Sequence, residues 1–238
     1  MTINDDQCWP LRGDTHDRDI NKSRHEREDS KKIFIIGSTG RTGGLVAEQA
    51  LSRGHIVTTM VRGPSGLGPH ERLRVVIGDV LRADDLAQAL SGQDVIISCL
   101  GQRSRSDRRL LQNAASAALA AMSRAGVCRY LVVSQGLLFP SRDPIVAVLR
   151  LLLKRHVADS SEMERRVGAS AADWTIVRAP RLLMGGSQRG YRSRLNALPR
   201  GAMTLERADL AAFLLDLAES EVHKRQVVGV TSAPRAFP

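Results

Sequence analysis

The chain has 238 residues, of which 42% are hydrophobic but only 3% aromatic, and its formal net charge is +10. This length and apolar content suit one globular domain with a core of Val, Leu, Ile and Ala. The positive charge attracts anions, yet no basic block with interleaved aromatic residues appears, so we expect no nucleic-acid partner. The three cysteines form neither a disulfide framework nor a metal-ligand pattern, so we expect no metal site, and Cys99 is interpreted as a small buried hydrophobe.

The N-terminal segment, residues 1–30, is rich in charge and poor in apolar residues. It holds eight acidic and five basic side chains. Low hydrophobicity and mixed charge predict a disordered tail, and no apolar stretch resembles a signal peptide. We therefore expect a cytoplasmic protein with a single folded domain at residues 31–238.

From Lys31 onward, short β-branched runs alternate with helical patterns. Strands are predicted at 32–37, 55–62, 72–79, 93–101, 128–136, 173–180 and 225–230, and helices at 43–54, 83–90, 107–126, 151–166 and 206–220. Apolar strands separated by helical crossovers are typical of a parallel sheet that is buried on both faces. The predicted fold is α/β, a Rossmann-type doubly wound parallel β-sheet with helices on both faces.

Two regions interrupt this alternation, 135–145 and 181–205. They follow the fifth and sixth strands, at the carboxyl ends where ligands bind in such sheets, so we interpret them as loops of a substrate cleft. The apolar segment 144–154 is too short to span a bilayer. We expect a core or interface helix there rather than membrane-surface binding, and hence no membrane partner.

The first strand runs into a glycine-rich turn, "IFIIGSTGRTGG". Gly37, Gly40 and Gly43 have the spacing G-x-x-G-x-x-G between a strand and a helix. A turn of this kind needs backbone conformations that a Cβ disfavours, and it lets a pyrophosphate approach the main chain. Amide groups at the helix start then face the anion. The turn predicts phosphate binding; a tight turn without a ligand is the alternative.

The end of the second strand indicates which dinucleotide is bound. An Asp or Glu there accepts hydrogen bonds from the ribose of NAD, but this chain carries Arg62 and no acid nearby. A guanidinium suits a 2′-phosphate, so we expect NADP, with NADPH preferred over NADH, and assistance from Arg41 and Ser65. A solvated strand end is the alternative role for Arg62. Further on, Asp79 follows the third strand and is expected to meet the adenine edge, and Gly101 closes the fourth.

With these features, the chain resembles the atypical short-chain dehydrogenases/reductases, in particular the group that contains flavin reductase (biliverdin reductase B) and its NmrA-like relatives. The motifs that carry the resemblance are "GSTGRTG", "TMVRG", "VIGDV", "VIISCLGQR", "YLVVSQGLL" and "DWTIVRAPRLLMG", in the family's order. They extend from Lys31 to about Leu217, over most of the folded part. The resemblance implies an NAD(P)H-binding enzyme.

The resemblance also implies a set of cofactor contacts. It assigns the pyrophosphate to Gly37, Thr39, Gly40, Thr42 and Gly43, the 2′-phosphate to Arg62, the adenine to Asp79 and Val80, and the path toward nicotinamide to Leu100, Gly101 and Arg103. Ser134 would lie beside the nicotinamide and the substrate, and Pro180 with Arg181 would pass the carboxamide. The family's reductase has His where this chain has Arg181, which leaves the substrate-side chemistry open.

Ordinary members of this superfamily use a Tyr-x-x-x-Lys pair for proton transfer. Here Tyr130 is followed four residues later by Ser134, and Tyr191 by Leu195, so the pair is absent. Alcohol–ketone chemistry is therefore not expected, and an epimerase or dehydratase, which needs the same tyrosine, ranks last. We expect hydride transfer from NADPH to a flavin-like or tetrapyrrole-like acceptor. A non-catalytic NADP(H) sensor or regulator of the NmrA-like kind is the alternative.

The candidate catalytic residues are Ser134 and His156. Ser134 ends a strand, where it could instead satisfy backbone groups, and His156 lies on a predicted helix, where a surface position is the alternative. Glu162 and Glu164 fit a charged helix face with the two arginines that follow, rather than an acid–base pair. The arginine-rich stretch 101–109 either binds an anionic small-molecule acceptor or caps the next helix. Whether the chain is a monomer or a homodimer is open.

Overall fold

The structure is a computed structural model, which describes residues 30–64, 66–101, 109–184, 190–201, 203–220 and 222–233. Contacts divide the chain into residues 1–30 and residues 31–238. The description below concerns the second unit.

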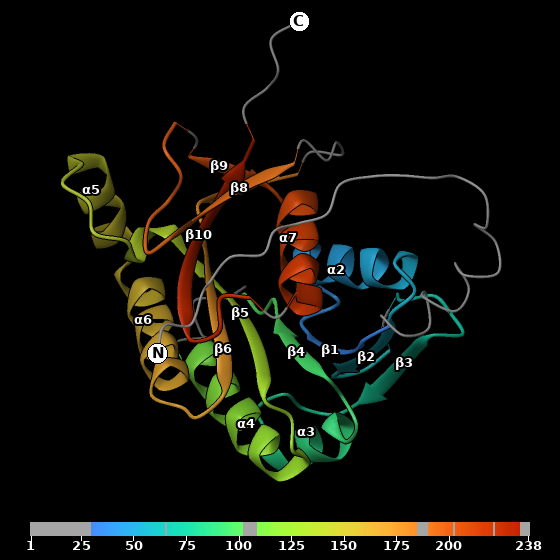
Figure 1. Ribbon diagram of the computed structural model, residues 1–238. Coiled ribbons are helices and arrows are strands. Elements are labelled where there is room, and N and C mark those ends of the chain that lie inside the picture. Colours follow the sequence, from blue (N-terminus) through green and yellow to red (C-terminus); the bar gives the residue numbers. More distant parts are fainter. Residues whose placement is uncertain are drawn as a thin grey trace, which may run out of the picture. The chain divides into compact units, whose positions relative to one another are not determined.

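A central sheet of eight strands has the order β3-β2-β1-β4-β5-β6-β10-β8 (Figure 1). Its strands are β1 (Lys32–Ile36), β2 (Ile56–Val61), β3 (Leu73–Ile77), β4 (Val95–Ser98), β5 (Arg129–Gln135), β6 (Asp173–Ala179), β8 (Tyr191–Leu195) and β10 (Gln226–Ser232). Every pairing is parallel except that of β10 with β8. The chain order reverses beside β1, as in a doubly wound sheet. The predicted Rossmann-type fold is confirmed.

Helices cover both faces of this sheet, as Figure 1 shows. The helices in the described ranges are α2 (Arg41–Ser52), α3 (Ala83–Leu90), α4 (Leu110–Ala125), α5 (Pro144–Leu152), α6 (Lys154–Gly168) and α7 (Arg207–Ser220). Because side chains alternate along a strand, Ile33 and Ile35 of β1 join the core beneath α2 and α7. Phe34 and Ile36 join the second core, beneath α3, α4 and α6. Both cores are mainly aliphatic, as the composition predicts, with Phe213 in the first and Phe34 and Tyr130 in the second.

The region 181–205 contains more regular structure than the predicted loop. It includes β7 (Arg181–Leu183), β8 (Tyr191–Leu195) and β9 (Thr204–Glu206). β7 and β9 form a small parallel pair, while β8 extends the main sheet. The sequence did not reveal these strands because they are only three to five residues long and none is a continuous apolar run.

The segment that follows β5 also differs from the prediction. A 3₁₀ turn, η1 (Gly136–Leu138), leads to α5 and α6, which meet at Leu153. Val146 is the one residue of α5 that is buried. Of the two predicted places for this helix, the core is therefore wrong, and an interface stays a prediction. Within the described ranges, no helix is both long and apolar enough to cross a membrane.

Candidate functional site

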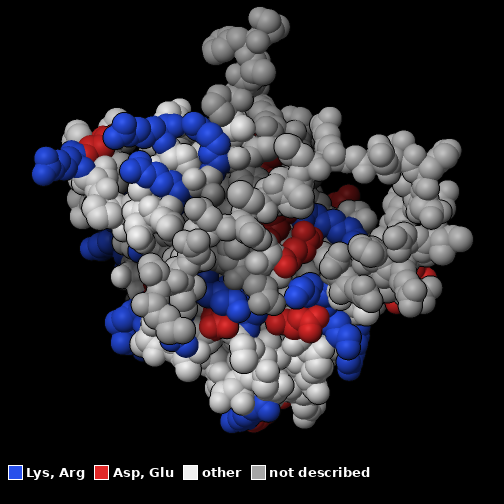
Figure 2. Space-filling model, in the orientation of Figure 1, with Lys and Arg blue, Asp and Glu red and all other residues white. Residues whose placement is uncertain are grey.

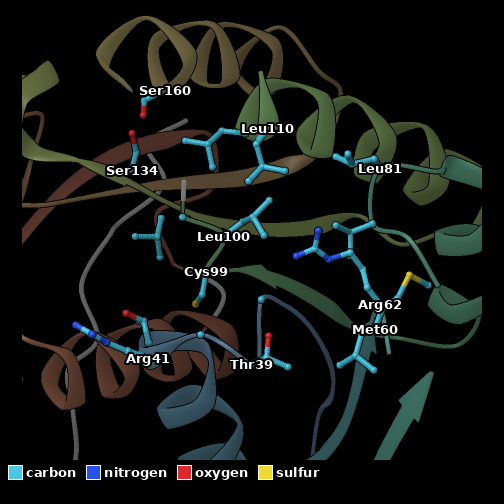
Figure 3. Close-up of a pocket in the computed structure, with 18 of the residues that line it drawn as sticks. Thr39, Arg41, Met60, Arg62, Leu81, Cys99, Leu100, Leu110, Ser134 and Ser160 are labelled. Atoms are coloured by element: carbon cyan, nitrogen blue, oxygen red, sulfur yellow. The ribbon is translucent and has the colours of Figure 1, made fainter. Parts of the chain in front are cut away.

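A cleft of about 870 Å³ lies at the carboxyl edge of the parallel strands. Its volume is in the range of small-molecule and cofactor sites. The lining comes from the turns after β1, β2, β3 and β4 and from the end of β5 (Figure 3). Among the predicted site residues, the lining includes Gly37, Thr39, Gly40, Arg41, Thr42, Arg62, Asp79, Val80, Leu100, Gly101 and Ser134.

The glycine-rich turn is specific to glycine for two different reasons. Gly37 has a φ of +88°, a conformation that L side chains rarely adopt, and it lines the cleft. Gly43 is not among the lining residues. A Cβ at Gly43 would lie 2.2 Å from the carbonyl oxygen of Gly37, so this glycine lets α2 pack against the turn. One glycine shapes the backbone, and the other sets the position of the helix.

The start of α2 has the properties of an anion site. Gly40 is the N-cap residue and has no side chain to bind the first helical N–H groups, and the first turn carries no acid. The helix dipole adds a partial positive charge at the same end. A dinucleotide pyrophosphate fits this cradle, because its oxygens would accept hydrogen bonds from amides that have no side-chain cap.

At one end of the cleft, Arg62 follows β2 and lines the wall. Its side chain is exposed, and no hydrogen bond or ion pair joins it to another described residue. Asp79 holds its own loop in place: its Oδ1 accepts from the N–H of Leu81 at 3.0 Å, and its N–H donates to Oδ2 of Asp85 at 3.1 Å. The predicted contributors Ser65 and Arg103 lie outside the described residues.

At the other end, Ser134 is linked to a buried ion pair. The Ser134 hydroxyl donates to Oε1 of Glu164 at 2.5 Å, and the Glu164 carboxylate binds Arg178 through Nη2 at 2.6 Å and Nε at 3.0 Å. The Arg178 guanidinium also lies 4.7 Å from the centre of the Phe139 ring. Because the hydroxyl proton points to Glu164, Ser134 presents oxygen lone pairs to the cleft.

The structure corrects the prediction for the two glutamates of α6. Glu162 does lie on the charged face, where hydrogen bonds from Arg165 and Arg166 lower the pKa of its carboxyl to about 2. Glu164 instead belongs to the buried face of α6. The sequence analysis placed Glu164 on the charged face because α6 carries many charged residues. Its burial is explained by its ion pair with Arg178 of β6.

Two further predicted residues are not among the described residues that line the cleft, His156 and Pro180. The His156 backbone carbonyl accepts from Nε2 of Gln135 at 3.0 Å, and the same amide donates to Oγ of Ser160 at 2.8 Å. Ser160, one turn later on α6, lines the cleft with Ser134, and Figure 3 draws both side chains. The geometry gives no support to a catalytic role for His156.

Two arginines line the cleft, and the sequence analysis assigned no ligand to the second of them, Arg207. Arg41 and Arg207 both line the wall, one at the start of α2 and the other at the start of α7. Burial and the positive charge of Arg41 lower the pKa of Arg207. The Arg207 guanidinium donates to the carbonyl oxygen of Leu182 at 3.3 Å. Two guanidiniums that repel each other favour an anion between them.

The described lining of the cleft offers neither a reactive thiolate nor a tyrosine hydroxyl for proton transfer. Cys99 lines it, but burial raises the pKa of the thiol to about 12, which keeps the thiol protonated at neutral pH. Neither tyrosine of the chain lines the cleft: Tyr130 is buried in the core, and Tyr191 donates a hydrogen bond to Asp216. Among the described residues, no group of three or more His, Cys, Asp or Glu side chains is placed to hold a metal ion.

Comparison with known proteins agrees with this geometry. The model of a family described as NAD(P)H-binding matches residues 37–221. An oxidoreductase from Lactococcus lactis superposes with a TM-score of 0.74 at 20% identity, covering 86% of this chain and 92% of its own. A short-chain dehydrogenase/reductase from Veillonella parvula in complex with NADP gives 0.67 at 20%, covering 87% and 97%. A Streptococcus pneumoniae protein named provisionally as an NADH-flavin reductase gives 0.71 at 19%, covering 86% and 100%.

A curated relative is similar over a short segment. The 3-beta-hydroxysteroid dehydrogenase of Mycolicibacterium neoaurum is 36% identical over 70 residues, which are 29% of this chain and 19% of that protein. The match thus spans less than a fifth of the relative's length. The predicted NAD(P)H-binding family and the predicted Rossmann fold are confirmed.

Proposed function

The chain belongs to the NAD(P)H-binding family, and we propose that it is an NADPH-dependent reductase that transfers hydride to a conjugated, flavin-like or tetrapyrrole-like acceptor. One observation carries this proposal: the cleft combines a phosphate cradle at α2 with a far end that contains serines but neither tyrosine. Reduction of an electron-poor ring does not need the tyrosine, because solvent can supply the proton.

The residues of the cleft act mainly by holding the two rings in place. When bound, the nicotinamide supplies a hydride, that is, two electrons and one proton, and the acceptor takes a second proton from water. The amides of the glycine-rich turn and of α2 anchor the pyrophosphate. Ser134, held by Glu164, accepts a hydrogen bond from an N–H group of the nicotinamide carboxamide or of the acceptor. The residues of the cleft would then raise the rate by holding donor and acceptor close together.

Turnover is tested directly by mixing the purified protein with NADPH and FMN, riboflavin or a quinone. The loss of nicotinamide absorbance measures the rate. We expect oxidation of NADPH that depends on both the protein and the acceptor, and a Ser134→Ala variant that retains binding but turns over more slowly. No turnover with any flavin, quinone or tetrapyrrole would contradict the proposal.

The preference for NADPH rests on Arg62, which is exposed at the cleft wall without a described partner. Charge-assisted hydrogen bonds to a 2′-phosphate contribute about 1.5–3 kcal/mol, or roughly ten- to hundredfold in affinity. We expect Arg62→Gln to weaken NADPH by that factor and to leave NADH almost unchanged, measured by fluorescence titration. Arg74→Gln, an exposed arginine on β3 that is outside the lining, is the matched control. Equal binding of NADPH and NADH by the unmodified protein would overturn the preference.

An anionic acceptor is supported by the pair Arg41 and Arg207. FMN and riboflavin share the reacting ring and differ by one phosphate, so they form a matched pair of acceptors. We expect Arg207→Gln to raise the KM for FMN about tenfold and to change the KM for riboflavin less than twofold. A rise in the KM for NADPH alone would instead assign the pair to the cofactor's pyrophosphate.

A second candidate function is a non-catalytic NADP(H)-responsive regulator. It is favoured by the same absence of a tyrosine from the lining residues. It requires tight NADP(H) binding, negligible turnover with every acceptor, and a protein partner whose binding changes between NADP and NADPH. Turnover in the assay above, together with no cofactor-dependent partner in a pull-down, would remove it.

A further inference from the structure

The helix α5 places its apolar side toward solvent. Ile145, Val148, Leu149 and Leu152 recur at i, i+3, i+4 and i+7, so they form one stripe along the helix. Their exposed fractions are 68%, 56%, 39% and 73%. We call these four residues the α5 apolar stripe. Large aliphatic side chains this exposed and this close together mark an interaction surface.

This orientation is fixed by the opposite side of α5, which packs on the protein. Val146 is buried there, and Arg150 donates through Nε to the carbonyl of Leu137 at 2.8 Å and through Nη2 to the carbonyl of Phe139 at 2.5 Å. Asp143 caps the helix by accepting from the N–H of Ile145 at 2.8 Å. The polar anchor faces inward and the apolar stripe faces outward, the reverse of an ordinary surface helix.

Basic residues lie at both ends of the stripe. Arg142 precedes α5, and Lys154 with Arg155 follows it; all three are exposed and none forms an ion pair with a described residue. Asp143 is the one acidic residue between positions 142 and 155. Figure 2 shows blue Lys and Arg side chains around this part of the molecule. The surface thus combines an apolar centre with a positive margin.

We propose that the α5 apolar stripe and its basic margin dock onto an anionic phospholipid surface. Aliphatic side chains would enter the acyl boundary, while Arg142, Lys154 and Arg155 remain at headgroup level beside the lipid phosphates. This differs from the sequence-based expectation of no membrane partner, because the sequence did not show which side of the helix is buried.

Charge favours a lipid surface over a second copy of this chain as the occupant. In a symmetric dimer through α5, the same patch of both subunits would meet. The basic margin of one subunit would then lie against the basic margin of the other. Like charges held close together across an interface oppose association. An anionic headgroup layer instead neutralises them. The net charge of +10 adds attraction of the same sign.

Docking would also orient the cleft. Gln135, which lines the cleft, ends β5; η1 follows it directly, and α5 begins at Pro144 after the connection 139–143. The segment that carries the α5 apolar stripe therefore starts at the edge of the sheet where the cleft lies. This orientation is independent of whether the acceptor is a flavin.

The test is co-sedimentation of the full chain with vesicles of phosphatidylcholine alone or with 30% phosphatidylglycerol. We expect binding to the anionic vesicles, little to the neutral ones, and weaker binding as salt increases. The double variant Ile145→Ser/Leu152→Ser should lose at least about tenfold in partitioning. Lys154→Gln/Arg155→Gln should lose about fivefold for each charge removed. The control Ile77→Ser/Met203→Ser replaces two apolar residues of similar exposure, 74% and 65%, and should bind normally.

Folding of each variant is checked by its circular dichroism and its stabilisation by NADPH. If folded Ile145→Ser/Leu152→Ser binds anionic vesicles as well as the unmodified chain, the proposal is overturned. It is equally overturned if the unmodified chain does not bind anionic vesicles. If that chain is also a dimer by light scattering, and these two substitutions convert it to a monomer, a second copy covers the stripe.

Discussion

At the scale of single residues, the least predictable feature is the chain of contacts from Ser134 through Glu164 to Arg178. Ser134 was expected at the cleft from its place after the fifth strand, and it lies there. Its partner was not expected, because Glu164 follows several charged residues on α6. The structure places this carboxylate between a hydroxyl and a guanidinium, away from water. The carboxylate thereby fixes the direction of the Ser134 hydroxyl.

A first prediction concerns this buried ion pair. Glu164→Ala leaves the Arg178 guanidinium, whose side chain is 16% exposed, without its carboxylate. We expect the free energy of unfolding to fall by about 3–5 kcal/mol, because an uncompensated buried charge is strongly destabilising. Urea denaturation measures the change. Glu162→Ala, which removes two more exposed pairs, with Arg165 and Arg166, from the same helix, should have a much smaller effect. Similar losses in the two variants would contradict the assignment.

At the scale of elements, the junction of β1 and α2 sets the geometry of the cleft. Gly37 allows the chain to turn, and Gly43 allows the helix to approach it. The start of α2 then points at the space between the strand ends, where a phosphate would lie. The motif was readable from the sequence because glycine is required at both positions for steric reasons.

A second prediction follows from the contact of Gly43. In Gly43→Ala, the new Cβ would lie 2.2 Å from the Gly37 carbonyl oxygen, so α2 must move away. We expect a loss of about 1–3 kcal/mol in unfolding free energy, together with weaker NADPH binding. Gly168→Ala, at the end of α6, is the control, since its Cβ would have only an ordinary contact at 3.9 Å with Trp174. It should be neutral or stabilising. An unchanged affinity for NADPH in Gly43→Ala would refute the role given to the turn.

At the scale of the whole unit from Lys31 onward, the cleft joins segments that are distant in the chain. Its lining extends from Gly37 to Arg207 and includes both halves of the sheet. A ligand that spans it would therefore connect the first βαβ half to β5, α6 and α7. Its binding energy should be distributed over one cooperative unit.

A third prediction tests this coupling. At a concentration of NADPH about 100 times its Kd, the free energy of unfolding should rise by roughly 2.7 kcal/mol. Tryptophan fluorescence and far-ultraviolet circular dichroism should report the same shifted transition, because Trp174 lies on β6 and the helices are spread over both halves. If one signal shifts and the other does not, the two halves unfold separately and the cofactor stabilises only one of them.

The sequence by itself determined the parallel part of the sheet, its helical layers and the glycine-rich turn. Those features depend on local rules: apolar strands, helical periodicity, and glycines where a Cβ has no room. Only the tertiary structure decided that Glu164 is buried, that Arg207 joins Arg41, that 181–205 contains strands, and which side of α5 faces solvent. Each of these features depends on contacts with residues that are distant in the chain. Such contacts cannot be predicted from the residues on either side of a position in the sequence.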